Sequence, residues 1–443
     1  GLNGGNPITV SGKTISTTTP NEIEMFHDDT VCSHEYYNAD GFCEACGAYQ
    51  KAIQSGEYYE IYNAGQLFWF AALVNGDHTH ADFSIQDSDA NAVLTKNIDL
   101  EGREWKPINN YSGKFDGNNH SISNLSITQG GENIGLFGSV NEGTISNLTL
   151  LSGSVSPHDS CRNVGSLIGE FNGGTVTNII SYVDIDDTES SITYIGGIVG
   201  SMSNASAYKC MNFGNINITH PSECIGGIAG CAYDFSSIDN CANIGNLKGE
   251  RVGVYIGGIL GYSKEVYVKV KNCYNYGNVS NSELDTISYC GAIIGRLEEY
   301  ISSNISNNYY LIGSANSEFG EDIPIHFMSD AKRKYDFDNG EVTYLLNHSQ
   351  TDGSQVWYQN IDNGKTPDPY PVFVGGTVYS KGNNEYTNYD PNHKNDEFKK
   401  DENGNFIIKD YDDLVKLSEL VRSDYKYYGS ESYILANNIV ADT

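Results

Sequence analysis

The sequence predicts an all-β fold: a right-handed parallel β-helix, or solenoid, with a capping helix and a small C-terminal subdomain. Three observations support this prediction. A short apolar phrase ending in glycine recurs at a nearly constant step, each repeat holds strand-length segments without an amphipathic helix, and a helical segment precedes the repeats. The composition agrees, because 48 glycines and 32 tyrosines accompany 39% hydrophobic residues, which is typical of many short strands joined by tight turns.

The repeated phrase has an apolar residue and one or two glycines, then two apolar residues and a closing glycine. Its six copies are Ile134–Gly138, Val164–Gly169, Ile195–Gly200, Ile225–Gly230, Ile256–Gly261 and Cys290–Gly295. The closing glycines are separated by 31, 31, 30, 31 and 34 residues. One such unit cannot bury its apolar side alone, whereas stacked units share a continuous core. The alternative is a β-propeller, but propeller blades usually have about 40 to 50 residues and a Trp-Asp or similar signature that this sequence lacks.

A second phrase, with the pattern Cys-x-Asn-x-Gly-Asn, lies within the later repeats. Its copies are Cys210–Ile216, Cys241–Leu247 and Cys273–Val279. Asparagines at equivalent corners predict ladders of side-chain amides between coils. The cysteines that open the phrase predict a buried column of thiols, because cysteine packs as a small hydrophobic residue.

These phrases resemble the GLUG repeat, most closely at Gly135–Gly138, Gly197–Gly200, Gly227–Gly230 and Gly258–Gly261. The resemblance covers roughly residues 110 to 315; Ser166 and Ala292 depart from it where the other copies have glycine. The GLUG repeat is found in large bacterial surface proteins and in bacterial IgA-specific metallopeptidases outside their catalytic domain. The resemblance therefore implies a cell-surface location and a β-helical stalk or adhesive segment, and it implies no chemistry.

The segment before the repeats predicts a helix that caps the solenoid. Apolar residues of 64–75 follow helical spacing, with Asn63 as N-cap, and a strand follows at 92–100. Such a helix covers the open end of the β-helix and prevents edge-to-edge association. The pattern returns 347 residues later, where Leu414, Leu417, Ser418 and Val421 correspond to Leu67, Phe70, Ala71 and Val74.

The chain therefore divides into six predicted segments. These are a knuckle segment (1–56), an N-terminal cap (57–110), a β-helix (111–318), a C-terminal subdomain (319–380), a linker (381–404), and the start of a second module or a C-terminal cap (405–443).

One group of residues has the spacing of a metal site: Cys32, His34, Cys43 and Cys46. The Cys-x-x-Cys-Gly turn directs two thiolates at one ion, and Cys32 and His34 complete four ligands for tetrahedral Zn²⁺. The segment resembles small zinc-knuckle segments over about 20 residues, and its few apolar residues need a staple. The role would be structural, because four protein ligands leave no open position. The alternatives are a disulfide between two of the cysteines and free thiols.

The charge balance excludes nucleic acid as a partner. Lysine and arginine number 26 against 57 acidic residues, giving a formal charge of −31, whereas phosphate binding needs clustered cations. The sequence has no apolar run of eighteen residues and predicts no membrane-spanning segment. A chain that begins at Gly1 without methionine suggests that an export signal has been removed, so we expect an extracellular or cell-surface protein.

The sequence contains no motif of a known catalytic class, so we expect no enzyme activity. It has no His-Glu-x-x-His, Gly-x-Ser-x-Gly or phosphate-binding loop, and no recurring cluster of arginine and aspartate. Asp184, Asp186 and Asp187 are interpreted as a solvated turn. A Ca²⁺ site at Asp336, Asp338 and Glu341 has some oxygen ligands but lacks the full loop spacing.

The predicted function is a non-catalytic bacterial adhesin or stalk that acts as a monomer and whose β-helix face binds host or cell-wall glycans or proteins. The alternative is a polysaccharide-active enzyme or carbohydrate-binding module that uses exposed tyrosine and tryptophan. Tyr274, Tyr276, Tyr309 and Tyr310 form the candidate stacking patch, although half-buried packing against the coil is the favoured interpretation.

Overall fold

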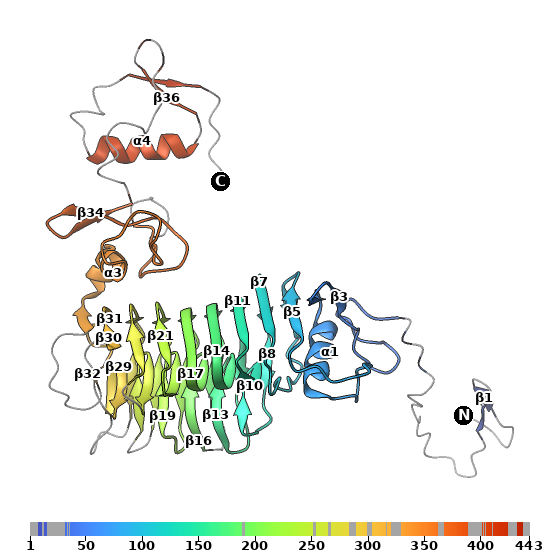
Figure 1. Ribbon diagram of the computed structural model, residues 1–443. Helices are drawn as coiled ribbons and strands as arrows, with labels where there is room; N and C mark the ends of the chain where they lie inside the picture. The colour runs from blue at the N-terminus through green and yellow to red at the C-terminus, as the bar shows by residue number, and fades with distance from the viewer. Residues whose placement is uncertain are drawn as a thin grey trace, which may run out of the picture.

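A long stack of short strands dominates the molecule (Figure 1). The computed structural model describes residues 8–10, 13–15, 32, 34, 36–187, 191–250, 254–264, 267–282, 289–298, 304–315, 317–319, 329–361, 367–388, 401, 403, 405–409, 411–423 and 432–436. The stack begins beside helix α1 (Ala64–Asn75) and ends beside a small subdomain (Figure 1).

Strands of successive coils pair in parallel and form three columns. The phrase column holds β9 (Asn133–Ile134), β13 (Cys161–Gly165), β16 (Ile192–Gly196), β19 (Cys224–Gly226), β24 (Tyr255–Gly257) and the start of β29 (Tyr289–Leu297). The short column holds β8 (Leu125–Ile127), β12 (Gly153–Val155), β15 (Asp184–Asp186), β18 (Ile216–Ile218), β23 (Leu247–Gly249) and β28 (Val279–Asn281).

The third column is the longest, because in two coils a single strand runs its whole width. This long column holds β7 (Lys114–Ser123), β10 (Phe137–Asn141), β11 (Thr144–Leu150), β14 (Ile168–Ser181), β17 (Val199–Asn212), β20 (Ala229–Tyr233), β21 (Ser237–Asp239), β22 (Ala242–Asn243), β25 (Leu260–Ser263), β26 (Lys269–Lys271), β27 (Tyr274–Asn275), β30 (Ile305–Ser306) and β31 (Asn308–Leu311). β32 (Ser317–Phe319) pairs with β29. The predicted all-β parallel β-helix is confirmed.

Equivalent residues of successive repeats lie directly above one another. One inward position of the long column passes through six coils and is at most 3% exposed throughout; its residues are Ile145, Val176, Ala207, Ile238, Val270 and Ile305. A period of about 31 residues therefore converts one apolar position into a continuous core.

Paired glycines make the sharp bend between the phrase column and the long column. A Cβ atom on Gly196 would lie 1.8 Å from the carbonyl oxygen of Val199, so no other residue fits without moving the backbone. Where the second glycine of the pair is replaced by Ser166, the side chain is buried and its hydroxyl donates to the carbonyl oxygen of Gly197 at 2.5 Å. The departure from the repeat therefore keeps the bend and adds a hydrogen bond.

The predicted asparagine ladder is present. The side-chain amide of Asn212 donates to Asn243 Oδ1, and that of Asn243 donates to Asn275 Oδ1, both at 2.9 Å. All three asparagines are fully buried, and each also donates to the glycine carbonyl two residues later. The cysteines of the same phrase, Cys210, Cys241 and Cys273, are fully buried in the core.

The N-terminal cap is a β-α-β unit. β4 (Tyr58–Ile61) and β5 (Asn91–Leu94) pair in parallel with α1 between them, and β5 pairs with β7 of the first coil. β3 (Ile53–Ser55) pairs antiparallel with β4, and β6 (Ile98–Asp99) pairs with β7. Asn63 is the N-cap as predicted, accepting from the Gln66 backbone amide at 2.9 Å.

The prediction of an amphipathic capping helix is wrong in one respect. Every residue from Ala64 to Val74 is buried, so α1 has no solvent face. The reason is that both sides of the helix are covered: the first coil lies on one side, and residues 36–50, here called the knuckle hairpin, lie on the other.

The C-terminal subdomain packs beside the last coils. It contains β33 (Ser329–Lys332), α2 (Lys334–Asp338), α3 (Glu341–Leu346), β34 (Tyr379–Gly382) and β35 (Glu385–Thr387). β33 pairs in parallel with β31, which attaches the subdomain to the solenoid. Beyond α3, Tyr358 and Val372 form an isolated antiparallel bridge.

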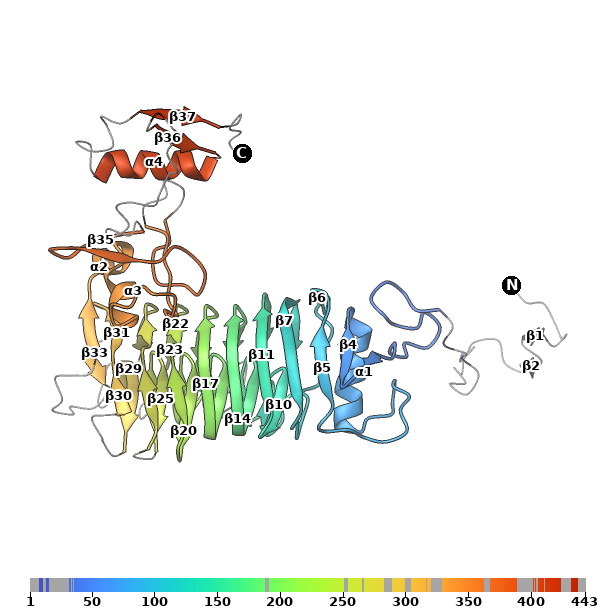
Figure 2. The ribbon, with the colours of Figure 1, turned by 45° about the horizontal axis from the view of Figure 1, so that its top comes forward.

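A second β-α-β unit follows (Figure 2). β36 (Phe406–Ile408) and β37 (Tyr433–Leu435) pair in parallel, with α4 (Tyr411–Ser423) between them in the chain. This repeats the order and pairing of β4, α1 and β5, as the 347-residue offset predicts. At the other end of the chain, β1 (Ile8–Val10) and β2 (Lys13–Ile15) form an antiparallel pair.

Candidate metal centre and tyrosine face

The four residues predicted to bind zinc lie together. One ligand atom from each of Cys32, His34 and Cys46 lies within 4.8 Å of the others. Cys43 joins them through a distance of 3.4 Å between its Sγ and Cys32 Sγ. In the part of the chain that the structure describes, no other group of three or more His, Cys, Asp or Glu residues has its ligand atoms this close.

The knuckle hairpin places the two cysteines of the Cys-x-x-Cys turn. Tyr37 and Cys43 form an antiparallel bridge, and the Cys43 backbone amide donates to the Ala48 carbonyl at 2.8 Å. Gly47 turns the chain back with a φ of 74°, and its amide donates to the Cys43 carbonyl at 2.8 Å. Only glycine adopts this left-handed conformation without cost, so the glycine after the second cysteine has a structural reason.

The two thiols differ in their electrostatic surroundings. Burial raises the pKa of Cys43, but hydrogen bonds from the Ala45 and Cys46 backbone amides outweigh it and lower the pKa below the ordinary value. At Cys46 burial dominates, and the proximity of Cys43 adds to it, so the pKa rises to about 11. Both thiols of such a pair become thiolates only when a cation compensates their charges.

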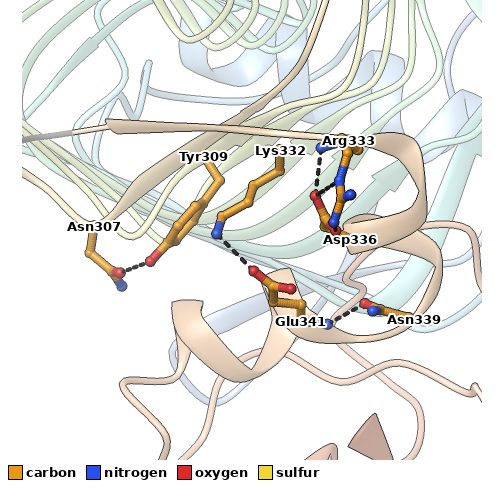
Figure 3. A network of polar contacts seen from close by, with 7 residues as sticks. All are labelled: Asn307, Tyr309, Lys332, Arg333, Asp336, Asn339 and Glu341. Atoms are coloured by element: carbon orange, nitrogen blue, oxygen red, sulfur yellow. Dashed lines mark hydrogen bonds and ion pairs between the residues drawn. The ribbon is translucent and has the colours of Figure 1, made fainter. Parts of the chain in front are cut away.

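The residues proposed as a Ca²⁺ site are engaged in separate ion pairs, and Figure 3 shows those of Asp336 and Glu341. Asp336 pairs with Arg333 at 2.6 Å and Glu341 pairs with Lys332 at 2.8 Å. Asp338 pairs with Lys334 at 2.7 Å. The Arg333 guanidinium holds the pKa of Asp336 below its usual value. The Glu341 pair therefore joins β33 to α3, whereas the other two pairs lie within α2 and its N-cap.

The acidic group of the β15 turn is only partly solvated. The Asp187 side chain is fully buried, and its Oδ1 accepts from the Thr219 amide and hydroxyl at 2.8 Å each. His220 Nδ1 lies 3.1 Å from Asp187 Oδ2. For Asp187 the solvated-turn interpretation is wrong, because the carboxylate fixes the corner of the next coil.

The predicted tyrosine patch of the late coils is covered. Tyr274 is fully buried and packs edge-on against Trp357, with ring centroids 5.2 Å apart. Tyr309 is 7% exposed, and Tyr276 packs against Phe337. The interpretation as packing is confirmed, although the partner is the C-terminal subdomain and not the coil alone.

Another aromatic cluster was not predicted. It lies at the bend between the phrase column and the long column, and we call it the tyrosine face, although Tyr194 and Tyr262 are buried in it and its other tyrosines are half-buried. Its members are Tyr194, Tyr233, Tyr255, Tyr262 and Tyr289, with the cations Lys264 and Arg296.

Two outward positions of the repeat supply most of this face. Tyr194, Tyr255 and Tyr289 each come directly before the repeated phrase, and Tyr262 and Arg296 each come directly after its closing glycine. In the strand register, Cys224 pairs with Tyr194 on one side and with Tyr255 on the other, and Tyr255 pairs with Tyr289. Tyr262 pairs directly with Arg296. A sequence pattern therefore existed: aromatic residues occupy the same phase of several repeats, on either side of the phrase.

Two cations are held among the rings. Lys264 Nζ lies 4.9, 5.4 and 5.2 Å from the ring centroids of Tyr194, Tyr233 and Tyr262, and it pairs with Glu223 at 3.0 Å. Burial lowers the pKa of Lys264, but the Tyr194 hydroxyl and Glu223 outweigh it and raise the pKa. The Arg296 guanidinium lies 4.7 Å from the Tyr255 ring centroid. Both positive charges are therefore fixed in a chain whose net charge is −31.

An exposed aromatic stack borders the tyrosine face. Phe235 and Tyr267 are 66% and 49% exposed, and their rings stack with centroids 4.6 Å apart and an interplanar angle of 19°. They follow Tyr233 and Lys264 by two and three residues. A shallow hollow of about 680 Å³ lies toward the earlier coils, lined by Gly130, Gly131, Glu132, Asp159, Ser160, Cys161, Arg162 and Thr193.

Comparisons with known proteins agree with the repeat. The GLUG motif family model matches residues 222–248, which confirms the resemblance to the GLUG repeat over this segment. Halomucin from Haloquadratum walsbyi is 44% identical over 57 residues, which are 12% of this chain and 1% of Halomucin. The chain therefore spans only a small fraction of that relative.

A crystal structure from Bacteroides ovatus, described as a "putative immunoglobulin A1 protease", aligns with a TM-score of 0.43 at 17% identity, covering 74% of this chain and 95% of that one. Neither the GLUG repeat nor the β-helix indicates a catalytic family. Among the residues described here, no helix is both long and apolar enough to cross a membrane.

Proposed function

We propose that this chain is a non-catalytic module of a bacterial cell-surface protein, and that its solenoid binds an anionic glycan at the tyrosine face. The GLUG repeat and the segment shared with Halomucin support the surface location. The regular stack of coils supports the stalk-like role, because a solenoid presents an extended surface at a fixed distance from its ends.

The observation that carries the binding proposal is the exposed stack of Phe235 on Tyr267, which follow Tyr233 and Lys264 of the tyrosine face in the sequence. Exposed aromatic rings present flat apolar surfaces to the C–H faces of sugar rings. Arginine and lysine recognise carboxylate or sulfate groups through charge-assisted hydrogen bonds. The class of ligand is therefore a polysaccharide with acidic groups.

A glycan array followed by titration calorimetry tests the proposal. We expect binding to uronate or sulfated polysaccharides, and weak or no binding to their neutral counterparts. The double variant Phe235→Ala, Tyr267→Ala should lose at least about tenfold in affinity, since two stacking contacts of about 1 kcal/mol each are removed. Because both rings are exposed, the variant should fold normally.

A matched control uses the exposed stack at another corner of the solenoid. Tyr182 is 42% exposed and stacks on Phe213 with centroids 4.6 Å apart. Tyr182→Ala should leave glycan affinity unchanged. Equal losses in both variants, or selective binding of a protein ligand by an array-negative chain, would contradict the proposal.

The same sample tests the alternative function of a polysaccharide-active enzyme. A hydrolase needs two carboxylates about 5 to 10 Å apart on either side of the scissile bond. Release of reducing sugar from any bound polysaccharide would show that the chain is a polysaccharide-active enzyme and not a binding module. We expect binding without turnover.

A further inference from the structure

We propose that Cys32, His34, Cys43 and Cys46 bind one Zn²⁺ ion, and that this ion holds the knuckle hairpin against α1. The site is independent of the tyrosine face, so failure of one proposal leaves the other intact. Its geometry, its donor atoms and the packing of the hairpin each point to a structural metal.

The distances fit ligands of one ion better than a disulfide. In tetrahedral zinc coordination with Zn–S bonds of about 2.3 Å, two sulfur ligands lie about 3.8 Å apart. Cys32 Sγ and Cys43 Sγ are 3.4 Å apart, whereas a disulfide bond is about 2.05 Å long. Cys32, His34 and Cys46 also converge on one point, which a bridge between two cysteines does not require.

The donor atoms select the metal. Three thiols and one imidazole form a borderline-soft set that suits Zn²⁺, while Ca²⁺ and Mg²⁺ prefer oxygen ligands.

The hairpin that carries the site closes the end of the solenoid. The carbonyl oxygen of Asp40 accepts from the Gly65 amide at the start of α1 at 2.6 Å. Phe42 packs edge-on against Phe68 of α1 with ring centroids 5.7 Å apart. The Arg103 guanidinium covers the other side of the Phe42 ring at 4.2 Å. A metal that fixes Cys43 and Cys46 therefore also fixes the cover of α1.

Metal analysis of the purified chain is the direct test. We expect one zinc per chain after dialysis, and after exchange to Co²⁺ the intense visible absorption of tetrahedral thiolate coordination. Cys46→Ser and His34→Ala should each reduce the zinc content at least tenfold. Cys161→Ser is the matched control, because that buried thiol contacts the Asp159 carbonyl far from the cluster and should retain one zinc.

Thiol counting distinguishes the alternatives without relying on variants. The unreduced, denatured chain should expose all ten cysteines once a chelator is present. Two missing thiols that return on reduction would show a disulfide and overturn the proposal. All thiols present with no bound zinc, even after incubation with excess Zn²⁺, would overturn it equally.

Hydrogen exchange tests the structural consequence. Chelation of the intact chain should increase exchange at least tenfold in residues 36–50 and in α1, while β14 and β17 in the middle of the solenoid stay protected. If chelation removes zinc but leaves exchange in these segments unchanged, the ion does not hold the hairpin against α1.

Discussion

The two β-α-β units of this chain share one topology but differ in how deeply the helix is buried. In the N-terminal unit, residues 64–74 of α1 are all buried. In the C-terminal unit, Leu414 of α4 is 40% exposed and Leu435 of β37 is 63% exposed. The same β-α-β topology therefore occurs once with a fully buried helix and once with a helix that is partly exposed to solvent.

The sequences of the two helices explain the difference. On its covered side, Gly65 of α1 lies against Gly41 of the knuckle hairpin and the Trp69 indole donates to the Asp82 carbonyl, whereas the residue of α4 aligned with Trp69 is Lys416. A charged face is stable in water, whereas an apolar face must be covered. The apolar surface of α1 therefore requires a cover, and the knuckle hairpin is part of the solenoid's cap.

The largest contrast is expected at the pair Trp69 and Lys416. Trp69 is 1% exposed and its indole donates to the Asp82 carbonyl at 3.1 Å. Trp69→Ala should lower the free energy of local unfolding of α1 by about 3 to 5 kcal/mol, because a large cavity remains. Lys416→Ala should change α4 by less than about 0.5 kcal/mol. Hydrogen exchange of the helix amides measures both; similar losses would contradict the comparison.

Gly65→Ala adds a methyl group where α1 lies closely against the knuckle hairpin. An added Cβ would lie 1.9 Å from the Gly41 carbonyl oxygen, so backbone must move. We expect a loss of about 1 to 3 kcal/mol, although alanine favours helices elsewhere. Limited proteolysis within residues 36–50 should accelerate. A stabilised variant would show that the hairpin does not contact α1 here.

The aligned positions 71 of α1 and 418 of α4 differ by one hydroxyl group, because the first is alanine and the second is serine. Ala71→Ser buries a hydroxyl in a site that is 5% exposed, at a cost of about 1 to 2 kcal/mol. Ser418→Ala removes a hydroxyl from an exposed site and should change stability by less than about 0.5 kcal/mol. Urea unfolding of both variants beside the parent chain decides whether the two helices differ in this way.

The smallest effect is expected from pH at the end of α1. Hydrogen bonds from Lys106, and then from Thr79, lower the pKa of Asp77 well below its usual value. A lowered folded-state pKa stabilises the protein above about pH 4, and this stabilisation disappears as the pH falls. Asp77→Asn should therefore cost up to about 1 kcal/mol at pH 7 and progressively less as the pH falls below about 4. A pH-independent difference in melting temperature would show that the effect comes from the change of side chain and not from the charge of Asp77.

The coils were predictable because their information is periodic. A step of about 31 residues placed Asn212 above Asn243, and Cys210 above Cys241, before any coordinates were known. The closeness of Cys32, His34 and Cys46 was predictable because these residues lie near one another in the sequence. Burial of Tyr274 was not predictable in detail, since its partner Trp357 lies 83 residues away and belongs to no repeat.

The tyrosine face shows a different limit of the sequence. Tyr194 and Tyr255 stand at one phase of the repeat, but the intervening coil has Cys224 there. A search for strictly periodic residues therefore misses this column of tyrosines. The contact between the rings of Tyr255 and Tyr262 depends on the sharp bend that Gly257 allows, because this bend brings the two outward positions together.

The parallel columns also determine how the solenoid responds to tension. Hydrogen bonds between coils run along the long axis, so a pull on its two ends opens them one after another and not all at once. Each coil of about 31 residues, once detached, extends to roughly 100 Å of free chain. A molecule built in this way absorbs mechanical work in regular steps, and the cap that encloses α1 is the first part of the structure to meet a load from the N-terminal side.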